Sequence, residues 1–163
     1  MLKIGLLSDT HSYLHNSIPD FFACCDEIWH AGDWGNIEVY NKLSALKPTK
    51  GVWGNIDGQD IRQLFPKTLR FKAEEVEVLL THIGGYPNKY DNSIKEELFL
   101  SPPKLMICGH SHILKVMYDK KLSMLHINPG AAGKYGLHSI STVIRFEINN
   151  DRIENLEVLE IKK

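Results

Sequence analysis

The sequence has no long hydrophobic run. No stretch approaches the ~20 consecutive apolar residues that a membrane-spanning helix needs, and the N-terminal apolar run Leu2–Leu7 stops at Ser8 and Asp9. That run is too short for the core of a signal peptide, and no small-residue cleavage site follows it. We therefore expect a cytoplasmic protein that has no membrane partner.

An excess of charge of one sign is also lacking. The 19 Lys and Arg residues face 20 Asp and Glu residues, which gives a formal net charge of -1. Proteins that bind nucleic acid or anionic membranes through a broad surface usually carry a basic excess. The balance therefore predicts no broad nucleic-acid surface, although it leaves room for a local basic pocket.

Cysteine is scarce, and its arrangement excludes two common uses. Among the three cysteines, Cys24 and Cys25 are adjacent and cannot easily pair with each other, so at least one thiol is left over. No Cys-x-x-Cys pair is present to indicate a sulfur-ligated zinc site. We interpret the thiols as reduced and mostly buried, as free cysteines in cytosolic proteins usually are.

Internal repeats, low-complexity tracts and linkers are absent as well. The 163 residues, 43% of them hydrophobic, are enough to bury the core of one domain, so a single domain is expected over residues 1–163. The glycine-rich stretch Gly130–Gly133 lacks the Lys-Ser or Lys-Thr pair of a P-loop. That absence excludes binding of a nucleoside triphosphate by this route.

The first half of the chain alternates strand and helix patterns. Near-continuous apolar runs predict buried strands over Lys3–Ser8, Glu27–Ala31 and Thr49–Trp53, as in a parallel sheet. A helix is expected near Asn16–Cys25, and helical spacing of apolar residues predicts a second helix over Asn36–Leu46. This order predicts a layered α/β arrangement with parallel strands.

The second half changes to strand patterns with one helix, which is predicted over Ser93–Leu100. Alternating or β-branched residues predict strands over Leu69–Lys72, Val76–Thr81, Lys104–Cys108, Leu114–Asp119, Leu122–Ile127, Thr142–Ile148 and Ile153–Ile161. Both halves together predict an α/β (α+β) fold in which two mixed β-sheets pack as a β-sandwich, with helices outside.

Short polar clusters follow five of the predicted strands. The clusters are Asp9-Thr10-His11, Gly32-Asp33, Gly54-Asn55, Thr81-His82 and Gly109-His110-Ser111-His112. In open α/β sheets the ligand crevice lies at the carboxyl ends of the strands, so the five stretches are expected to converge on one place. Three clusters have glycine directly before the polar residue, which allows a tight backbone turn.

The side chains in these clusters suit a pair of divalent metal ions. Carboxylate, imidazole and amide ligands favour Mn, Fe, Zn, Ni or Co over copper(I). Two such ions about 3.5–4 Å apart can share a water molecule and lower its pKa to about 7. They also offset the charge that grows on phosphoryl oxygens during attack. The expected chemistry is attack of the hydroxide on phosphorus, with no serine or cysteine nucleophile.

Taken in order, the five clusters resemble the motifs of the calcineurin-like metallophosphoesterase superfamily. The short chain and the segment Asn128-Pro129-Gly130 are similar to its small, single-domain bacterial and archaeal phosphodiesterase branch. The resemblance spans residues 9 to 130. It implies the superfamily's β-sandwich flanked by helices, a metal-bridging hydroxide as the nucleophile, and a small phosphate ester as the substrate.

The resemblance also implies a role for each polar residue. Asp9, His11 and His112 would hold the first ion, Asn55, His82 and His110 would hold the second, and Asp33 would bridge the two. No catalytic side chain is identified, and Asn55 and His110 are supporting candidates. The choice among manganese, nickel, iron and zinc stays open at this stage.

One position departs from the superfamily's pattern. Many members have histidine directly after the Gly-Asn pair, where it is thought to donate a proton to the leaving group. Here that residue is Ile56, which cannot donate, and the change favours diesters or activated substrates. Two alternatives stay open: a phosphomonoesterase of the same fold, and a binding or scaffold protein like the retromer subunit that resembles this superfamily. The complete ligand set favours an enzyme.

Some residues outside the clusters invite a functional interpretation. A loop over residues 133–138 could reach the site and touch substrate phosphate through His138 or Lys134, although loop residues are more often solvated. His30 and His126 lie within predicted strands and are interpreted as structural. The alternating C-terminal tail is expected to form an edge strand, which could pair with another copy in a homo-oligomer.

Overall fold

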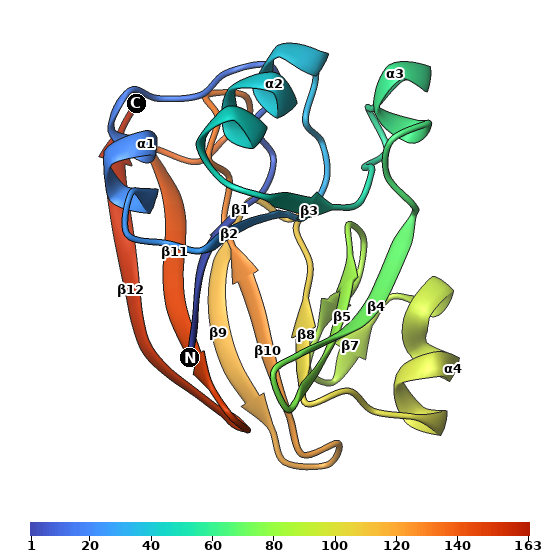
Figure 1. The fold of residues 1–163 in the computed structure, drawn as a ribbon. Coiled ribbons are helices and arrows are strands. Elements are labelled where there is room, and N and C mark those ends of the chain that lie inside the picture. The colour runs from blue at the N-terminus through green and yellow to red at the C-terminus, as the bar shows by residue number, and fades with distance from the viewer.

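Two five-stranded sheets pack face to face in the computed structural model, which describes residues 1–163 (Figure 1). The first sheet has the order β12-β11-β1-β2-β3. Its strands are β1 (Leu2–Leu7), β2 (Glu27–His30), β3 (Thr49–Gly51), β11 (Ile140–Asn149) and β12 (Arg152–Lys162). Strands β1, β2 and β3 run parallel, whereas β11 runs antiparallel to β1 and β12 forms an edge.

The second sheet has the order β4-β5-β8-β10-β9. Its strands are β4 (Thr68–Ala73), β5 (Val76–Thr81), β8 (Leu105–Ile107), β9 (Leu114–Asp119) and β10 (Met124–Pro129). Strands β5, β8 and β10 are parallel, and β4 and β9 are antiparallel to their neighbours. Two mixed sheets packed as a sandwich were predicted from the sequence, and the structure confirms that prediction.

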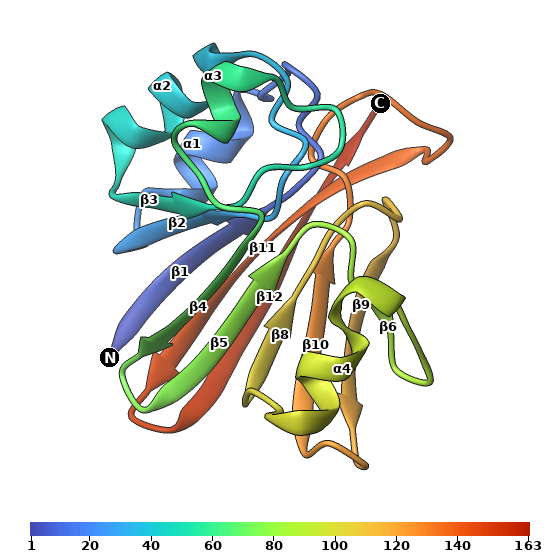
Figure 2. The ribbon, with the colours of Figure 1, turned by 90° about the vertical axis from the view of Figure 1, so that its right-hand side faces the viewer.

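Helices lie on the outer faces of both sheets (Figure 2). They are α1 (Ser17–Phe22), α2 (Ile37–Leu46), α3 (Gln59–Arg62) and α4 (Asn92–Leu100). The first three cover the first sheet, and α4 covers the second together with a short hairpin of β6 (Gly85–Tyr86) and β7 (Lys89–Tyr90). The Asp91 carboxylate caps α4 by accepting the Ser93 N–H at 2.9 Å. None of the helices has the length and apolar character that crossing a bilayer requires.

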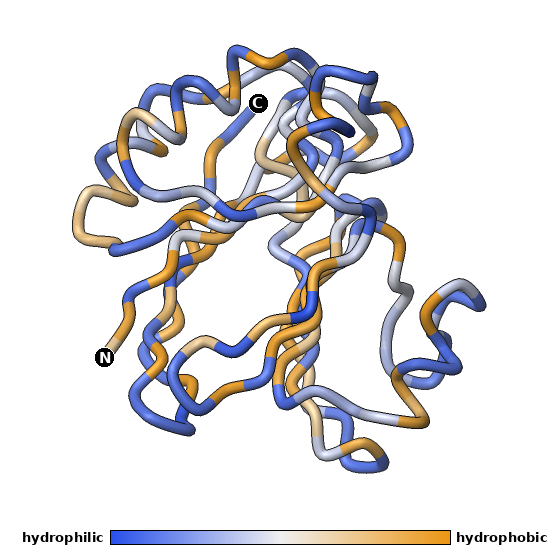
Figure 3. The backbone as a smooth tube through the Cα atoms, turned by 45° about the vertical axis from the view of Figure 1, so that its right-hand side comes forward, coloured by the Kyte–Doolittle hydropathy of each residue, from blue (hydrophilic) through white to orange (hydrophobic).

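The core consists of three apolar layers, one between the sheets and one under each set of helices. Paired strand residues point to the same face, so Leu6 packs between its neighbours Trp29 and Ile144 in the inner layer. In Figure 3 orange segments alternate with blue and pale ones along many strands, and the hairpin turns at the bottom are mainly blue. Each large side chain that is fully buried contributes about 1.5–3 kcal/mol.

Several sequence predictions need correction. The first helix ends at Phe22 rather than Cys25, because the chain must turn there for the Asp26 N–H to reach the Lys3 carbonyl oxygen. Strand β3 ends at Gly51, before the predicted Trp53, and β10 begins two residues later than predicted. The short helix α3 and the β6–β7 hairpin were not predicted.

Candidate metal centre

The loops that follow four strands are joined by backbone hydrogen bonds. The His11 N–H donates to the Asp33 carbonyl at 3.1 Å, which ties the loop after β1 to the loop after β2. The Gly109 N–H donates to the His82 carbonyl at 2.9 Å, which ties the loops after β8 and β5. The His110 N–H donates to Oδ2 of Asp9 at 3.1 Å and links the two pairs of loops. The convergence of polar clusters predicted from the sequence is therefore present in the structure.

Five of the seven expected ligands have left-handed backbone. Their φ angles are 54° at Asp9, 44° at His11, 58° at Asp33, 69° at His110 and 61° at His112. Residues other than glycine rarely adopt positive φ, and such conformations concentrate at functional sites where the surrounding contacts hold them. The sequence gives no sign of this conformation.

A first group of side chains consists of Asp9, His11 and His112, whose ligand atoms lie within 4.8 Å of one another. Asp9 is fully buried. Its Oδ1 lies 3.2 Å from Nε2 of His112 and 3.9 Å from Nε2 of His11. This grouping has one carboxylate and two imidazoles, a donor set that suits a divalent transition-metal ion.

A second group consists of Asp33, His82 and His110, again within 4.8 Å of one another. Oδ2 of Asp33 lies 3.2 Å from Nε2 of His82 and 3.5 Å from Nε2 of His11, so this carboxylate faces both groups. Asn55, expected in this group, places its Oδ1 3.1 Å from Nε2 of His82. All seven side chains predicted from the sequence are thus brought to one place.

The hydrogen bonds of His82 test whether this donor set fits a cation. Its Nδ1 lies 2.7 Å from the Ala31 carbonyl oxygen, which can only accept, so Nδ1 carries the proton. In the neutral ring Nε2 then presents a lone pair toward the oxygens of Asn55 and Asp33. Lone pairs that converge in this way are satisfied either by a proton on Nε2 or by a cation between them, and this tautomer is the one in which Nε2 can ligate a metal.

Two buried atoms of the first group point to the same requirement. Oδ1 of Asp9 and Nε2 of His11 are buried and have no hydrogen-bond partner. A buried polar atom without a partner costs about 1–3 kcal/mol, and both atoms face neighbouring ligand atoms rather than apolar side chains. The residues therefore fit a pair of divalent ions.

Burial and charge set the protonation of the site. Burial lowers the pKa of His11 and outweighs the attraction of Asp33 and Asp9, which favours the neutral imidazole that a ligand must be. Burial alone would lower the pKa of His82, but the adjacent Asp33 and Asp9 carboxylates outweigh it and raise that pKa. Burial alone would raise the pKa of Asp33, and the neighbouring His82 outweighs it and lowers that pKa.

Three further polar side chains orient the ligands and were not predicted. The Ser8 hydroxyl donates to Oδ2 of Asp9 at 2.7 Å. Oδ2 of Asp57 accepts the Gly54 N–H at 2.7 Å and so holds the turn before Asn55. The Asn128 amide donates to the Gly109 carbonyl at 2.9 Å, next to His110. Such second-layer contacts fix the direction in which metal ligands point.

The glycine-rich loop over residues 133–138 reaches the site, which is one of the two interpretations that the sequence left open. The His138 ring lies 5.3 Å from the His112 ring, and the Tyr135 ring stacks on His11 at 4.8 Å. The Lys134 ammonium lies 4.3 Å from the Tyr13 ring centroid. Whether His138 and Lys134 touch the substrate stays a prediction.

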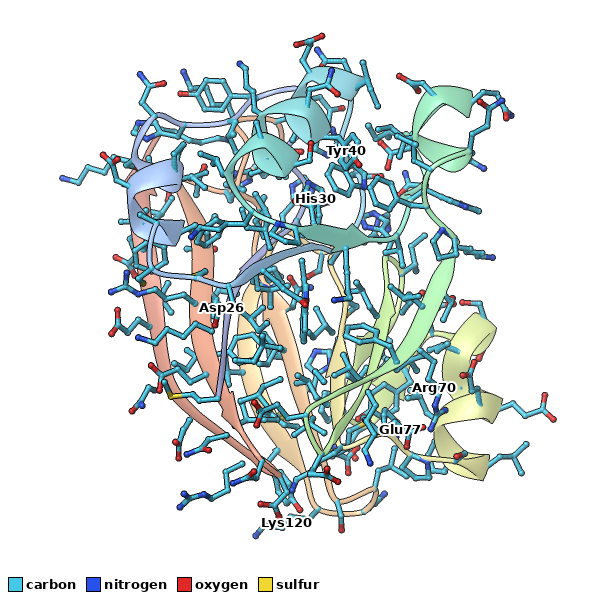
Figure 4. The ribbon with its side chains drawn as sticks, viewed as in Figure 1. Asp26, His30, Tyr40, Arg70, Glu77 and Lys120 are labelled. Atoms are coloured by element: carbon cyan, nitrogen blue, oxygen red, sulfur yellow. The ribbon has the colours of Figure 1, made fainter.

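Two buried aromatic residues, His30 and Trp34, lie behind the site. His30 lies in the interior beneath α2, near Tyr40 (Figure 4), and its Nε2 lies 3.0 Å from the Thr10 hydroxyl. It supports the loop after β1 and has the structural role that was expected. Trp34, which directly follows Asp33, is fully buried against His30 and Phe65 and belongs to the core.

The sequence and the fold are similar to those of known phosphoesterases. A sequence model of the calcineurin-like phosphoesterase superfamily domain matches residues 2–151. The phosphodiesterase MJ0936 of Methanocaldococcus jannaschii is 26% identical over 158 residues, which cover 87% of this chain and 90% of that protein.

Two solved structures show the same fold. An archaeal phosphodiesterase superposes with a TM-score of 0.78 at 21% identity, over 97% of this chain and 100% of that one. Vps29 of Entamoeba histolytica in complex with Zn2+ superposes with a TM-score of 0.76 at 16% identity, over 99% of both chains.

Proposed function

This chain belongs to the calcineurin-like phosphoesterase superfamily, and from that premise we propose that it is a phosphodiesterase that works with two divalent metal ions. Asp9, His11 and His112 would hold one ion and Asn55, His82 and His110 the other, with Asp33 facing both. When bound, the ions would activate a water molecule and offset negative charge on the phosphoryl group. The observation that carries the proposal is the buried Oδ1 of Asp9, which has no hydrogen-bond partner and faces several imidazole nitrogens.

The protein's own residues would position both the ions and the substrate. Ser8 and the His110 N–H both donate to Oδ2 of Asp9, at 2.7 and 3.1 Å, which leaves Oδ1 of Asp9 free for a cation. The Ile56 N–H donates to Oδ1 of Asp33 at 3.1 Å, so that Oδ2 of Asp33 is directed toward His11 and His82. Each carboxylate is thus oriented before any ligand arrives, which lowers the cost of reorganisation.

The preference for diesters rests on Ile56. Its side chain is 47% exposed directly beside Asn55, at the place where a proton donor for the leaving group would be expected. An apolar side chain there gives no help to a poor leaving group. A phosphodiesterase among the relatives, at 26% identity, supports the same choice. The competing assignment is a phosphomonoesterase.

The test is hydrolysis of bis-p-nitrophenyl phosphate by the full chain after chelation and refilling with Mn2+, Ni2+ or Zn2+. We expect turnover that depends on added metal, exceeds turnover of p-nitrophenyl phosphate, and falls at least ~100-fold in Asp33→Asn, since even outer-layer changes cost 10–100-fold. Asp151→Asn, in an exposed turn, is the matched control.

Two results would contradict the proposal. Faster turnover of the monoester would overturn the diester preference while leaving a metal-dependent phosphoesterase. No turnover of either ester, in protein shown to bind two ions, would favour a binding or scaffold protein on this fold.

A further inference from the structure

A cavity beside the second ligand group carries positive charge that the metal centre does not use. Its volume is 340 Å³, within the usual range for small-molecule sites of about 300–1,000 Å³. Asn55 and His82 form part of its lining, and Trp53, Arg62 and Lys67 also line it. We call it the Trp53 cavity. Whatever occupies it lies next to the atoms that would hold the second ion.

The two cations of the Trp53 cavity have no ion-pair partners. Each of the other arginines pairs with acidic side chains: Arg70 with Glu77 and Glu97, Arg145 with Glu157, and Arg152 with Glu154. Figure 4 shows Arg70 and Glu77 beside each other. Arg62 and Lys67 make no such pair, and Arg62 is therefore an exception among the arginines of this chain.

Arg62 is held in place even though its charge is unpaired. Its guanidinium carbon lies 4.0 Å from the Trp53 ring centroid, and its Nε–H donates to the Asp57 carbonyl at 2.6 Å. The remaining contact, from Nη2 to the Asn55 carbonyl, is long at 3.5 Å. A guanidinium fixed on an aromatic face loses little freedom when it binds a ligand, and its free N–H groups match the oxygens of a phosphate.

One acidic side chain in the cavity offsets part of this charge. Asp91 is the one acid that lines it. Oδ1 of Asp91 already accepts the Ser93 N–H at 2.9 Å and the Ser93 hydroxyl at 2.6 Å. Two cations therefore stand against one carboxylate, and the excess of positive charge favours an anion in the cavity.

We propose that the Trp53 cavity is a subsite for a second phosphate of the substrate, bound by Arg62 and Lys67. The inference rests on the proposed function, because it places this phosphate on the organic arm of the diester that is cleaved. The substrate class is thus a phosphodiester that carries a further phosphate group, rather than a neutral diester. Simple model diesters lack that group and leave the subsite unused.

A matched pair of substrates tests the subsite. One is thymidine 5′-(p-nitrophenyl phosphate), and the other is the same ester with an added 3′-phosphate. In the metal-loaded full chain we expect kcat/KM to be roughly tenfold higher for the 3′-phosphorylated ester, equivalent to about 1.4 kcal/mol. Lys67→Gln should bring the ratio of the two kcat/KM values close to one, because Lys67 has no hydrogen bond or ion pair to lose within the protein.

Variants of Arg62 probe the second cation of the cavity, and a lysine outside the cavity serves as the control. Arg62→Gln should also lower the ratio, and Arg62→Lys should retain part of it. Lys42→Gln changes an exposed lysine on α2 and should leave the ratio as it is in the wild type. Raising the salt concentration should reduce the wild-type ratio, since exposed charges are screened.

Binding can be followed without catalysis through Trp53. Trp29 and Trp34 are 0% exposed, so a ligand in the cavity should change the fluorescence of Trp53 selectively. Inorganic pyrophosphate, added to the full chain after chelation, should change the emission saturably, with an affinity about tenfold weaker in Lys67→Gln.

Equal kcat/KM for the two thymidine esters, or pyrophosphate binding insensitive to Lys67→Gln, would overturn the subsite. Absence of all esterase activity, bis-p-nitrophenyl phosphate included, would instead defeat the proposed function, and the fluorescence titration would still decide the subsite.

Discussion

At the scale of single residues, the site is built from backbone conformations that are costly elsewhere. Left-handed φ angles at Asp9, Asp33 and His110 each cost roughly 1–3 kcal/mol for a side chain other than glycine. The cost is offset locally, because the Ser8 hydroxyl and the His110 N–H hold the Asp9 carboxylate. The fold thus accepts strained backbone at these residues and places several ligand atoms within 4.8 Å of one another.

The buried side chain of His126 is expected to make the free energy of unfolding fall at acidic pH. It is 1% exposed on β10, neither ring nitrogen has a partner, and burial lowers its pKa from 6.5 to about 4. The imidazole of His126 therefore binds a proton more readily in the unfolded chain than in the folded one. As pH falls from about 6.5 toward 4, this difference lowers the free energy of unfolding. The full effect is about 3 kcal/mol.

Urea unfolding at pH 7.5 and pH 4.5 measures this effect. The wild type should lose about 2 kcal/mol more of its unfolding free energy between these pH values than His126→Leu does. Other titrating groups are common to both proteins and cancel in the comparison. An equal loss in both would show that His126 is charged or solvated in the folded state.

The sequence predicted the candidate metal ligands but not the polar side chains that orient them. The seven expected ligands stand in short polar clusters at strand ends, and such clusters are visible in a sequence. Ser8, Asp57 and Asn128 were missed because a serine, an aspartate in a turn and an asparagine before proline are common without any site. The adjacency of Ser8 to Asp9 and of Asp57 to the Gly-Asn pair could have indicated two of them, and the segment Asn128-Pro129-Gly130 was noted without a role for its asparagine.

At the scale of elements, the turns after the strands decide the geometry of the site. Gly54 lies between β3 and Asn55 and packs against the loop after β2. A Cβ at Gly54 would lie 2.1 Å from Oδ1 of Asp33 and 2.3 Å from its backbone nitrogen. The backbone cannot yield as a flexible side chain would, so any side chain here must separate two loops that carry ligands.

Gly54→Ala is therefore expected to lower the unfolding free energy by about 1–3 kcal/mol, the usual cost of overpacking, and to reduce metal-dependent hydrolysis at least ~10-fold. The matched control is Gly58→Ala in the same loop, where the nearest atom to a Cβ would be Oδ1 of Asp60 at 3.4 Å. Thermal unfolding and hydrolysis of bis-p-nitrophenyl phosphate measure both effects. Equal behaviour of the two variants would contradict this account of the turn.

Elements with a strong local pattern were predicted better than elements that depend on distant partners. Strand β1 is a near-continuous apolar run and β5 is rich in β-branched residues, and the structure confirms both strands almost to the residue. Helix α3 has four residues, too few for a periodic pattern. The β6–β7 hairpin has two residues in each strand and no alternation to recognise.

At the scale of the whole molecule, each ligand group draws on both sheets. Asp9 and His11 follow β1 of the first sheet, whereas His112 follows β8 of the second. In the second group, Asp33 follows β2 of the first sheet, and His82 follows β5 of the second. Which strands share a sheet is set by pairings between distant parts of the chain, and the sequence did not show this division. Any ion bound here would join the two halves of the sandwich.

The most direct test of the central claim is a calorimetric titration of the chelated full chain with Mn2+. We expect two ions per chain for the wild type and at most one for His112→Ala, which removes a ligand of the first group only. Asp33→Asn should weaken both binding events, because Asp33 faces both groups. A wild-type stoichiometry of one or none, repeated with Ni2+ and Zn2+, would contradict a two-metal centre. Two ions retained at full affinity in Asp33→Asn would contradict the placement of that centre.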